Sequence, residues 1–223
     1  MDECAIEQND KWPTYPAYKP SGIDWLGEVP EHWEIVRIRE HAALLNGFPF
    51  DSDLFGTSDG IPLVRIRDIL STDTTVIWTG DPVPSAMIGN SDILIGMDGD
   101  FNVAWWKGGP ALLNQRVCCL RSFASLDQRF LYYLLPYPLT IQNDLTYATT
   151  VKHISSYEIL HFHIGLPPLP EQRTIAAFLD ERTAKIDALI DLGMRDVKLL
   201  TEYRTALISA AVTGKIDVRG GVA

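Results

Sequence analysis

The chain has 223 residues, of which 46% are hydrophobic, and it carries a formal net charge of −10 at pH 7. This apolar content is enough to build a packed core and argues against a disordered chain. The sequence has no apolar run of about 18 residues and begins with the acidic stretch MDECAIEQND, so we expect neither a membrane span nor a secretory signal. The three cysteines, two of them adjacent, cannot pair evenly and favour a reduced, cytoplasmic setting.

The negative charge is unevenly distributed along the chain. Residues 166–223 carry eight acidic and eight basic side chains, so the whole acidic surplus lies before residue 166. A protein that binds DNA without regard to sequence needs many lysines and arginines to neutralise phosphates, and this composition argues against that class. A protein that reads base edges while a partner holds the DNA backbone is compatible with it.

Residues 1–30 are predicted to form an extended N-terminal arm. The segment WPTYPAYKPSG contains three prolines and alternating aromatic residues, which favour an extended chain packed against another part of the molecule. In the segment IVRIR, Ile35, Arg37 and Arg39 alternate with Val36 and Ile38. This period of two predicts a half-buried first strand.

Residues 31–165 are predicted to form one small β-rich domain. Between about residues 61 and 120, the apolar runs IPLVRIRDIL, TTVIWTG, SDILIGMDG, FNVAWW and RVCCL are separated by Gly, Pro, Asp and Asn at roughly ten-residue intervals. This spacing favours an irregular, mostly antiparallel sheet. The segment LDQRFLYYLLPYP then predicts a helix that ends at Pro136, and Ser155 with Glu158 fits the capping box of a second helix.

A long amphipathic helix is predicted over residues 166–215, followed by a tail over 216–223. Helix-forming residues dominate from Glu171, after the prolines of LPPLP, and only Gly193 interrupts them before Gly214 ends the helix. About 40 residues at a rise of about 1.5 Å give a rod of roughly 60 Å, which is too long to bury its apolar stripe on so small a domain. The helix therefore needs a partner helix. The positions expected at that helix–helix interface are Ile175, Leu179, Ile186, Ile190, Met194, Val197, Leu200 and Leu207.

Side chains that could support catalysis or bind a metal ion have simpler explanations. Asp98 and Asp100 in MDGDF suit a metal-dependent nuclease, but an Asp-Gly hairpin turn is the commoner use of this pattern. His161 and His163 would share one face of a strand, yet no third metal ligand accompanies them. The adjacent cysteines lie in an apolar run typical of a core. Because phosphate-binding, dinucleotide-binding and Gly-x-Ser-x-Gly motifs are also missing, we expect no catalytic site and no metal site.

Several polar residues have the chemistry needed to read DNA. The motif LLNQRV supplies asparagine, glutamine and arginine, which bond to adenine and guanine edges. LVRIRD places two arginines on one face of a predicted strand, and YATTVKHIS supplies hydroxyl groups and a lysine suited to phosphate contacts. Each alone is more often an ordinary surface residue, but together they support a DNA-reading hypothesis. The candidate DNA-binding residues are Arg65, Arg67, Asn102, Lys107, Asn114, Gln115, Arg116, Thr149, Thr150 and Lys152.

Segments along most of the chain resemble the specificity subunit of type I restriction–modification systems. They are YKPSGIDWLGEVPEHWE, GIPLVRIRDI, SDILIGMDGD with LLNQRV, TTVKHIS, LPPLPEQRTIAAFLDERTAKID and LISAAVTGKIDVR, and they extend from Tyr18 to Arg219. The most specific are GIDWLGEVPEHWE and PLPEQRTIAAFLDERTAKIDALI. Members of this family normally carry two target-recognition domains, each followed by a long helix, and the two helices pair antiparallel.

The resemblance implies an α+β fold, in which a small β-rich target-recognition domain precedes one long α-helix that pairs as an antiparallel coiled coil. It also implies a non-catalytic subunit that reads one half of a split target in double-stranded DNA, while the paired helices set the distance between the halves. The helices would help to seat methyltransferase subunits, which bring S-adenosylmethionine, so this chain needs no cofactor of its own. A restriction subunit is a further partner in the family. The implied setting is cytoplasmic, without membrane contact.

The chain departs from the family pattern because it has one recognition domain and one helix. Its family-like beginning and end are expected of a half-length form. Two copies paired through residues 171–213 would make a two-fold homodimer that recognises an interrupted palindrome. Two alternatives stay open at this point: pairing with a different chain that carries the second recognition domain, and a protein-interaction module that does not bind DNA.

Overall fold

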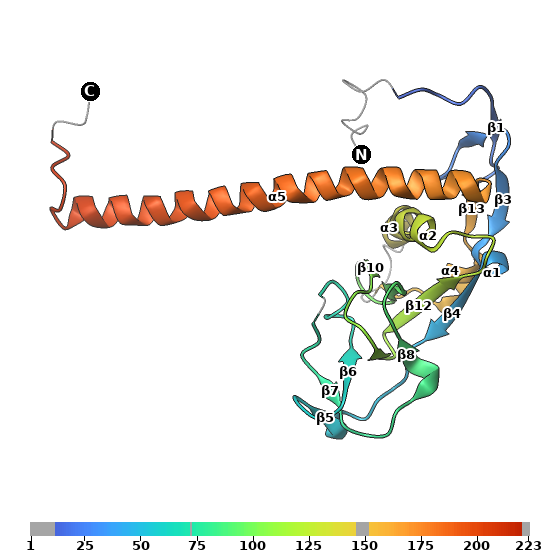
Figure 1. Ribbon diagram of the computed structural model, residues 1–223, viewed down its shortest axis with the longest axis horizontal. Coiled ribbons are helices and arrows are strands. Elements are labelled where there is room, and N and C mark those ends of the chain that lie inside the picture. The colour runs from blue at the N-terminus through green and yellow to red at the C-terminus, as the bar shows by residue number, and fades with distance from the viewer. Residues whose placement is uncertain (1–11, 72, 146–151, 220–223) are drawn as a thin grey trace. The chain divides into compact units, whose positions relative to one another are not determined.

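Figure 1 shows the computed structural model of the chain, which describes residues 12–71, 73–145 and 152–219. The chain divides into two units, one ending at Ala176 and the other beginning at Ala177. The first unit contains small β-sheets and short helices, and the second contains most of one long C-terminal helix. The predicted α+β class is therefore confirmed.

The N-terminal arm is extended where the structure describes it, and part of it folds into a hairpin. Strand β1 (Tyr18–Pro20) pairs antiparallel with β2 (Glu28–Pro30), with Lys19 opposite Val29. The Val29 side chain is buried. The arm is thus attached to the domain by apolar packing of Val29, whereas the strand pairing joins two parts of the arm to each other.

The first predicted strand is shorter than expected. Strand β3 spans Glu34–Arg37, and a short helix, α1 (Ile38–His41), follows where the prediction continued the strand to Arg39. The Glu40 carboxylate accepts a hydrogen bond from the Arg37 backbone N–H, an arrangement that starts a helical turn. The turn lets Ile38 become completely buried in the core.

A four-stranded antiparallel sheet forms the centre of the first unit. Both faces of this sheet are covered: Ile93 and Ile95 point into one apolar cluster, whereas Leu94 between them points into another. Burial on both faces explains why ILIG and VCCL are continuously apolar in the sequence. The strand order is β10 (Val103–Trp105), β9 (Ile93–Gly96), β12 (Val117–Ser122) and β4 (Ala42–Asn46).

A second, five-stranded sheet is built from very short strands. Its order is β5 (Phe55–Gly56), β7 (Ile77–Trp78), β6 (Ile61–Val64), β11 (Ala111–Leu113) and β8 (Met87–Ile88). The pair β6–β11 is parallel and the other pairs are antiparallel, which agrees with the mostly antiparallel prediction. Two single turns, η2 (Ser52–Leu54) and η3 (Pro84–Ala86), precede β5 and β8. Phe50, Leu63 and Trp78 pack in the cluster beneath this sheet.

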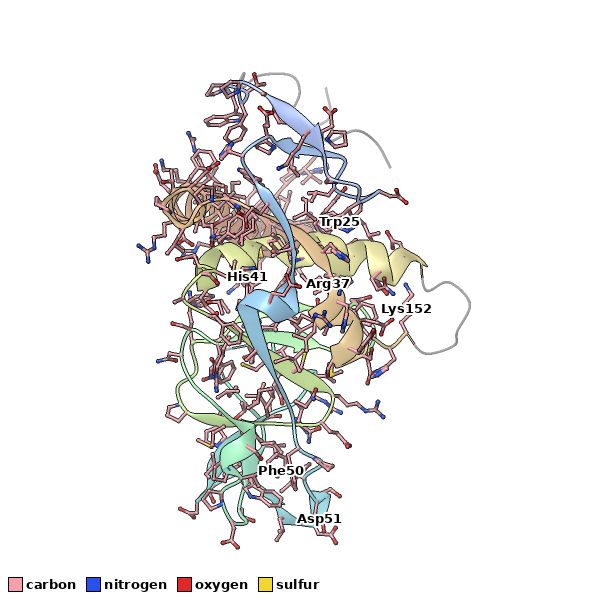
Figure 2. The ribbon with its side chains drawn as sticks, turned by 90° about the vertical axis from the view of Figure 1, so that its right-hand side faces the viewer. Trp25, Arg37, His41, Phe50, Asp51 and Lys152 are labelled. Atoms are coloured by element: carbon pink, nitrogen blue, oxygen red, sulfur yellow. The ribbon has the colours of Figure 1, made fainter. Side chains whose placement is uncertain are left out.

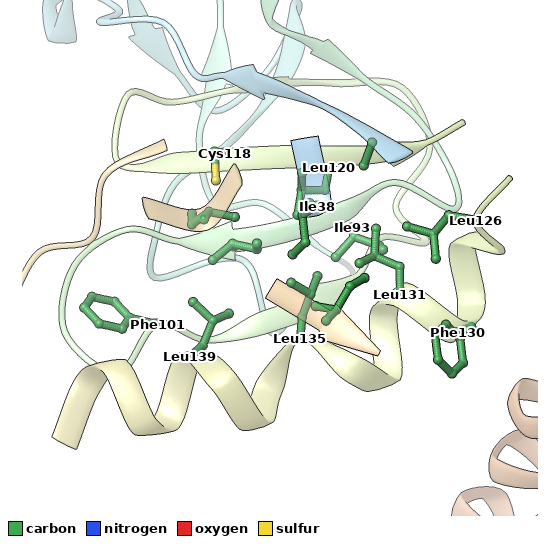
Figure 3. Close-up of a cluster of buried hydrophobic side chains, with 14 of the residues drawn as sticks. Ile38, Ile93, Phe101, Cys118, Leu120, Leu126, Phe130, Leu131, Leu135 and Leu139 are labelled. Carbon is green, nitrogen blue, oxygen red and sulfur yellow. The ribbon is translucent and has the colours of Figure 1, made fainter. Parts of the chain in front are cut away.

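Helices α2 (Gln128–Leu134) and α3 (Pro136–Leu145) cover one face of the four-stranded sheet (Figure 3). The predicted helix does stop before Pro136, because α2 ends at Leu134, but the prediction missed that Pro136 occupies the first position of a second helix, α3, with Leu135 in a helical conformation between the two. A proline is tolerated at the first helical position, where its missing N–H would have no intrahelical partner. Leu131, Leu135 and Leu139 pack beside Ile93 and Ile38 in the core.

The segment from residue 152 to the long helix contains helix α4 (Ser156–His161) and strand β13 (His163–Leu166), which pairs with β3. The predicted capping box is confirmed: Ser155 Oγ accepts from the Glu158 N–H, and the Glu158 carboxylate accepts from the Ser155 N–H. The prediction that His161 and His163 share a strand face was wrong. His161 ends α4 and His163 begins β13, because the cap starts a helix ahead of the strand.

The long helix α5 (Leu169–Val212) lies within the predicted range 166–215 and begins two residues before Glu171, from which helix-forming residues dominate. Pro170 lies in its first turn, where proline is compatible with a helix. The helix continues through Gly193, which therefore does not interrupt it, and Gly214 follows its end with φ +71°, a left-handed conformation that suits glycine.

Glu171 in the first turn of α5 holds the N-terminal arm. Its carboxylate accepts hydrogen bonds from Tyr15 Oη (2.6 Å) and Trp33 Nε1 (3.0 Å), and it lies 2.7 Å from His32 Nε2. The hydrogen bond to Glu171 and burial raise the pKa of Tyr15 to about 12, so the phenol remains a donor. The PEHWE and PLPEQR segments are far apart in sequence, but they contact each other through these bonds.

Gln172 ties the same turn of α5 to the start of α2. Its side chain is buried, with Oε1 accepting from the Asp127 N–H (2.7 Å) and Nε2 donating to the carbonyls of Pro167 (2.8 Å) and Ser125 (3.2 Å). Every polar atom of this amide group has a partner, as a buried amide requires. Ile175 and Ala176 then pack against the core of the first unit, so Ile175, a predicted pairing position, faces its own domain.

The part of α5 in the second unit leaves large apolar side chains exposed. We call the exposed predicted pairing positions the exposed stripe. They are Ile186, Ile190, Met194, Val197, Leu200 and Leu207, whereas Leu179 is half-buried. In the described part of the chain, no helix combines the length and apolar character needed to cross a membrane.

Candidate nucleic-acid interface

The four-stranded sheet brings several connecting segments to one of its edges. β12 begins at Val117 opposite Gly96, the last residue of β9, and Cys118 lies opposite Asn46, the last residue of β4. Antiparallel pairing therefore places the end of β4, the β9–β10 connection and the β11–β12 connection side by side. We call the surface formed by residues 46–48, 97–102, 114–116 and 152–156 the loop face.

Backbone hydrogen bonds join these segments into one surface. The Met97 N–H donates to the Arg116 carbonyl (3.0 Å), which ties the β9–β10 connection to the β11–β12 connection. The Gly99 N–H donates to the Lys152 carbonyl (3.0 Å), and the Ile154 N–H donates to the Met97 carbonyl (2.9 Å). These bonds bring segments more than 50 residues apart in sequence into fixed positions on the loop face.

The segment after β4 passes close to the backbone before β12. A Cβ atom on Gly47 would lie 2.0 Å from the Asn114 carbonyl oxygen, so this approach requires glycine. The next residue, Phe48, donates its N–H to the Leu113 carbonyl (2.8 Å), and its ring is 42% exposed. Asn46, at the other side of the glycine, accepts a hydrogen bond from Ser156 Oγ. The glycine thus anchors an exposed ring and an amide on the loop face.

Asp98 orients two basic side chains on the loop face. Its Oδ1 lies 2.7 Å from His153 Nδ1, and its Oδ2 lies 3.4 Å from Arg116 Nη1. The Arg116 side chain is 57% exposed and the Asp98 side chain 22%, so the guanidinium faces solvent above the carboxylate. An arginine bonded on one side still has N–H donors for a guanine edge or a phosphate. Asp98 also lies in the predicted hairpin connection, where Gly99 has φ +75°.

The predicted base-reading residues Asn114, Gln115 and Arg116 form the turn between β11 and β12. The Val117 N–H donates to the Asn114 carbonyl (2.9 Å) and closes this turn. Gln115 and Arg116 are exposed, and Asn114 is half-buried. Two amides and one guanidinium therefore emerge from one tight turn, next to the segment that contains Lys152.

The two arginines predicted on one strand face are not on a strand. β6 ends at Val64, and Arg65 and Arg67 lie in the turn that follows. Arg65 is committed to its own domain: Nε donates to the buried Asp68 (3.0 Å) and Nη2 to Thr75 Oγ1 (2.6 Å). Arg67 is exposed. The strand prediction failed because Asp68 caps the turn through the Arg65 N–H, a contact that alternation cannot show.

The remaining predicted DNA-binding residues are divided between different places. Asn102 is exposed on the loop face, where its carbonyl accepts from the Gly96 N–H. Lys107 lies beyond the other end of β10, near Asp92, whose carbonyl accepts from the Trp106 N–H. Lys152 belongs to the loop face through its carbonyl. The two predicted threonines, Thr149 and Thr150, lie outside the described residues.

The adjacent tryptophans of the β10 region serve the core. Trp106 is buried and donates its Nε1–H to the Gly109 carbonyl (2.7 Å). Trp105 is half-buried, packs against the core, and lies under the Arg129 guanidinium, 4.6 Å from its ring centroid. Neither ring is an exposed stacking platform, in keeping with the core position expected of strand aromatics.

The cysteines and aspartates considered for catalysis or metal binding have structural roles. Burial raises the pKa of both Cys118 and Cys119 to about 12, so the thiols stay protonated at neutral pH. Asp98 and Asp100 have no partners that would complete a metal site: among residues 12–71, 73–145 and 152–219 there is no group of three His, Cys, Asp or Glu side chains able to hold a metal ion. The polar side chains of the loop face therefore serve as hydrogen-bond donors and acceptors.

The sequence reasoning missed several residues of this surface. His153 was not singled out, although it lies in the segment TTVKHIS, and Asp98 was considered as a metal ligand or a turn residue only. Asn46 and Ser156 meet although 110 positions separate them. A carboxylate just after a buried strand and a histidine beside a candidate lysine were signals in the sequence, but their pairing depends on strand register.

Comparison with known proteins identifies the family. The type I restriction modification DNA specificity domain matches residues 30–191, which is most of the chain. The chain therefore belongs to this family. The matched range includes every segment of the loop face.

Curated relatives agree with this assignment. The chain is 37% identical over 196 residues to the type I restriction enzyme EcoBI specificity subunit of Escherichia coli, covering 87% of this chain and 41% of that protein. It is 26% identical over 211 residues to the MjaVIII specificity subunit of Methanocaldococcus jannaschii, covering 87% of this chain and 48% of that protein. The chain thus spans a little under half the length of these relatives.

Solved structures share the fold. A chain from a type I R-M system, solved to explain complex assembly and conformational transition, superposes with a TM-score of 0.68 at 21% identity, covering 87% of this chain and 48% of that one. The HsdS subunit from Thermoanaerobacter tengcongensis superposes with a TM-score of 0.57 at 24% identity, covering 77% of this chain and 41% of that one. These similarities establish the α+β architecture with its long helix.

Proposed function

We propose that this chain is a non-catalytic DNA-recognition subunit of a type I restriction–modification complex and that the loop face reads one half of a split target. The observation that carries this proposal is the convergence of Asn114, Gln115 and Arg116 with the Asp98–His153 pair on one surface. Amide and guanidinium groups are the side chains that bond bidentately to adenine and guanine edges. Their turn is fixed by backbone hydrogen bonds, so little order must be gained on binding.

Within this surface the residues have different roles. Gln115 and Arg116 are exposed and contact base edges, while Asp98 holds the Arg116 guanidinium in position. Lys152, with the neighbouring Thr149 and Thr150 outside the described residues, supplies phosphate contacts. Asn102 lies at the rim of the same surface. Arg65 is better explained as part of the Asp68 ion pair than as a DNA contact.

We propose further that two copies pair through the exposed stripe of α5 to form an antiparallel homodimer. Exposed apolar side chains in a continuous row indicate a protein partner, and a two-fold pair of identical helices would bury them symmetrically. The 44 residues of α5, at about 1.5 Å each, span about 66 Å. At about 34–36 Å per helical turn of DNA, half-sites about one to two turns apart would match, in an interrupted palindrome.

The proposed partners are a methyltransferase subunit, which would bind S-adenosylmethionine, and a restriction subunit that would add cleavage. Two similar proteins support such partners: the EcoBI relative is named as the specificity subunit of a restriction enzyme, and the solved type I R-M system is described as assembling into a complex. A cytoplasmic setting follows from access to DNA. This chain would then need no cofactor of its own.

The first experiment measures the mass of the purified chain in solution, alone and with its methyltransferase subunit, followed by selection of bound sequences from random duplex DNA. We expect a dimer, a complex with methyltransferase, and enrichment of an interrupted palindrome. R116A should reduce the preference for that sequence by about 1–3 kcal/mol. R173A is the matched control, since it removes an arginine that is 68% exposed and lies outside the loop face.

Different results would point to the alternatives. Enrichment of an asymmetric site only when a second specificity chain is added would replace the homodimer by a mixed pair. A chain that selects no DNA sequence, with or without methyltransferase, would be a protein-interaction module, and its net charge of −10 would suit that role.

A further inference from the structure

Two arginines outside the loop face are held in an unusual way. Arg37 Nε donates to His163 Nε2 (3.1 Å), and Arg39 Nη1 lies 3.0 Å from His161 Nε2. We call these four residues the arginine strip. It is formed by the end of β3, by α1, by the end of α4 and by the start of β13.

The histidines of the strip accept hydrogen bonds and are neutral. A guanidinium has donors only, so each ring Nε2 facing an arginine must carry a lone pair. His161 Nδ1 lies 2.7 Å from the Tyr157 carbonyl and must donate to it, which fixes the tautomer. The Tyr157 ring stacks on His161 with centroids 3.7 Å apart and further fixes the ring.

Among the described residues, five other arginines of this acidic chain are paired with carboxylates, which offset their charge. Within the part of the chain that the structure describes, neither Arg37 nor Arg39 has a carboxylate partner on its guanidinium. A neutral imidazole holds each arginine in place and leaves its positive charge uncompensated. The contrasting ion pairs are Arg65–Asp68, Arg116–Asp98, Arg121–Asp92, Arg173–Asp127 and Arg219–Asp217.

The strip lies beside the loop face. Helix α4 begins at Ser156, which bonds to Asn46 of the loop face, and ends at His161 of the strip. Its six residues rise by about 9 Å, which is about three base pairs of duplex at about 3.4 Å each. Figure 2 shows Arg37 and Lys152 in the middle part of the first unit, whereas Phe50 and Asp51 lie at its lower end.

We propose that the arginine strip binds the phosphate backbone of the duplex that flanks the half-site read by the loop face. This inference rests on the proposed DNA-reading function. Arg37 and Arg39 contact phosphates directly. His161 and His163 are positioning residues, because their hydrogen bonds fix the orientation of the two guanidinium groups. The exposed Glu40, whose carboxylate accepts from the Arg37 N–H, opposes binding through its charge. The strip gives an acidic chain a local grip on DNA without partner subunits.

The test measures the affinity of the full chain for a labelled 30-base-pair duplex of mixed sequence, as a function of salt. Each phosphate contact contributes about 0.9 to the slope of log affinity against log salt concentration. R37Q/R39Q should lower that slope by about 1.8 and weaken binding about 30-fold near 0.15 M salt, equally for all sequences. K19Q/K215Q makes the same change in net charge outside the strip and should leave the slope unchanged. Thermal unfolding confirms that both variants fold.

Two further variants separate charge from position. E40Q removes the opposing carboxylate but keeps an acceptor for the Arg37 N–H, so binding should tighten by a few-fold. H161F keeps the stack on Tyr157 and removes the acceptor of Arg39. Measured at pH 8, it should weaken binding about 3- to 10-fold through lost pre-organisation, while the salt slope stays the same because no charge is removed.

Different results would overturn this proposal and the proposed DNA-reading function. If the wild-type chain binds the duplex and R37Q/R39Q keeps its affinity and salt slope, the strip is not a phosphate site and the DNA-reading function survives. If the double variant binds DNA normally but loses its methyltransferase subunit, the strip is a protein contact instead. If the wild-type chain fails to bind duplex at low salt, both proposals fall.

Discussion

In its first turns α5 has Glu171, Gln172 and Ala176 engaged with its own domain, whereas from Ile186 onward its large apolar side chains are exposed. The same helix thus contains a stretch in which Glu171 and Gln172 are hydrogen-bonded to its own domain and a stretch whose large apolar side chains are exposed. The first stretch is complete within one chain. We propose that a partner covers the second, because a continuous exposed apolar row is unfavourable in water.

The largest expected effect comes from breaking the second stretch. V197E/L200E puts two carboxylates into the exposed stripe of each copy, and a two-fold pair would bury four charges without partners. We expect the dimer dissociation constant to rise by at least about 100-fold, with the first unit still folded. Sedimentation over a concentration series measures this.

A control for that experiment changes charge elsewhere on the same helix. K198E lies between the two positions in sequence but not in the exposed stripe, and it should leave association nearly unchanged. Equal masses for the wild type and V197E/L200E over the whole series would show that the stripe does not mediate self-association.

A smaller effect is expected from breaking the first stretch. Q172A leaves the Asp127 N–H and the carbonyls of Pro167 and Ser125 without their buried partner. We expect a loss of about 2–3 kcal/mol in the free energy of unfolding, because buried polar groups without partners retain their desolvation cost. Urea unfolding of the full chain measures it.

The neighbouring Arg173 offers a matched control, since its side chain is 68% exposed and lies 3.9 Å from Asp127. R173A should change stability by less than about 0.5 kcal/mol. If Q172A and R173A were equally stable, the amide would not anchor the helix. The dimer constant of Q172A should stay close to the wild-type value wherever the protein is folded.

The smallest expected effect depends on pH. Burial raises the pKa of the Glu171 carboxyl, but hydrogen bonds from Tyr15, His32 and Trp33 outweigh burial and hold the pKa below its ordinary value of 4.5. A carboxyl with a depressed folded pKa stabilises the protein above its unfolded pKa, and this stability is lost as the pH falls through the folded pKa. The contribution should therefore be complete near pH 6 and decline below about pH 4.5.

E171Q removes this pH-dependent contribution while keeping an acceptor of similar size. The variant should be less stable than the wild type at pH 6, and the difference should shrink as the pH is lowered below about 4.5. Urea midpoints at several pH values measure the difference. A constant gap between the two proteins across that range would show that ionisation of Glu171 does not hold the arm.

Local patterns in the sequence were enough for much of the fold. Turn residues at regular intervals indicated the antiparallel sheet, the Ser155–Glu158 pair indicated the start of α4, and the apolar stripe with Gly214 indicated α5 and its end. These features depend on neighbours within a few residues, where side-chain spacing acts directly on the backbone. The same reasoning placed Asn114, Gln115 and Arg116 together because they are consecutive.

Other features were decided only by contacts between distant segments. The break between β3 and α1 and the turn position of Arg65 follow from the side chains of Glu40 and Asp68, whose bonding competes with a continued strand. Pro136 follows the end of α2 and begins α3, and the second role depends on the packing of α3 on the core.

The loop face and the arginine strip show the same limit at the level of function. Composition and motifs were sufficient for the class of fold and the long helix, and they indicated the candidate base-reading turn. Folding was needed to bring Asp98 to His153 and Arg116, and to set Arg37 and Arg39 against neutral histidines instead of carboxylates. The reason is that strand register and the capping of α4 set which side chains meet, and neither can be read from one segment alone.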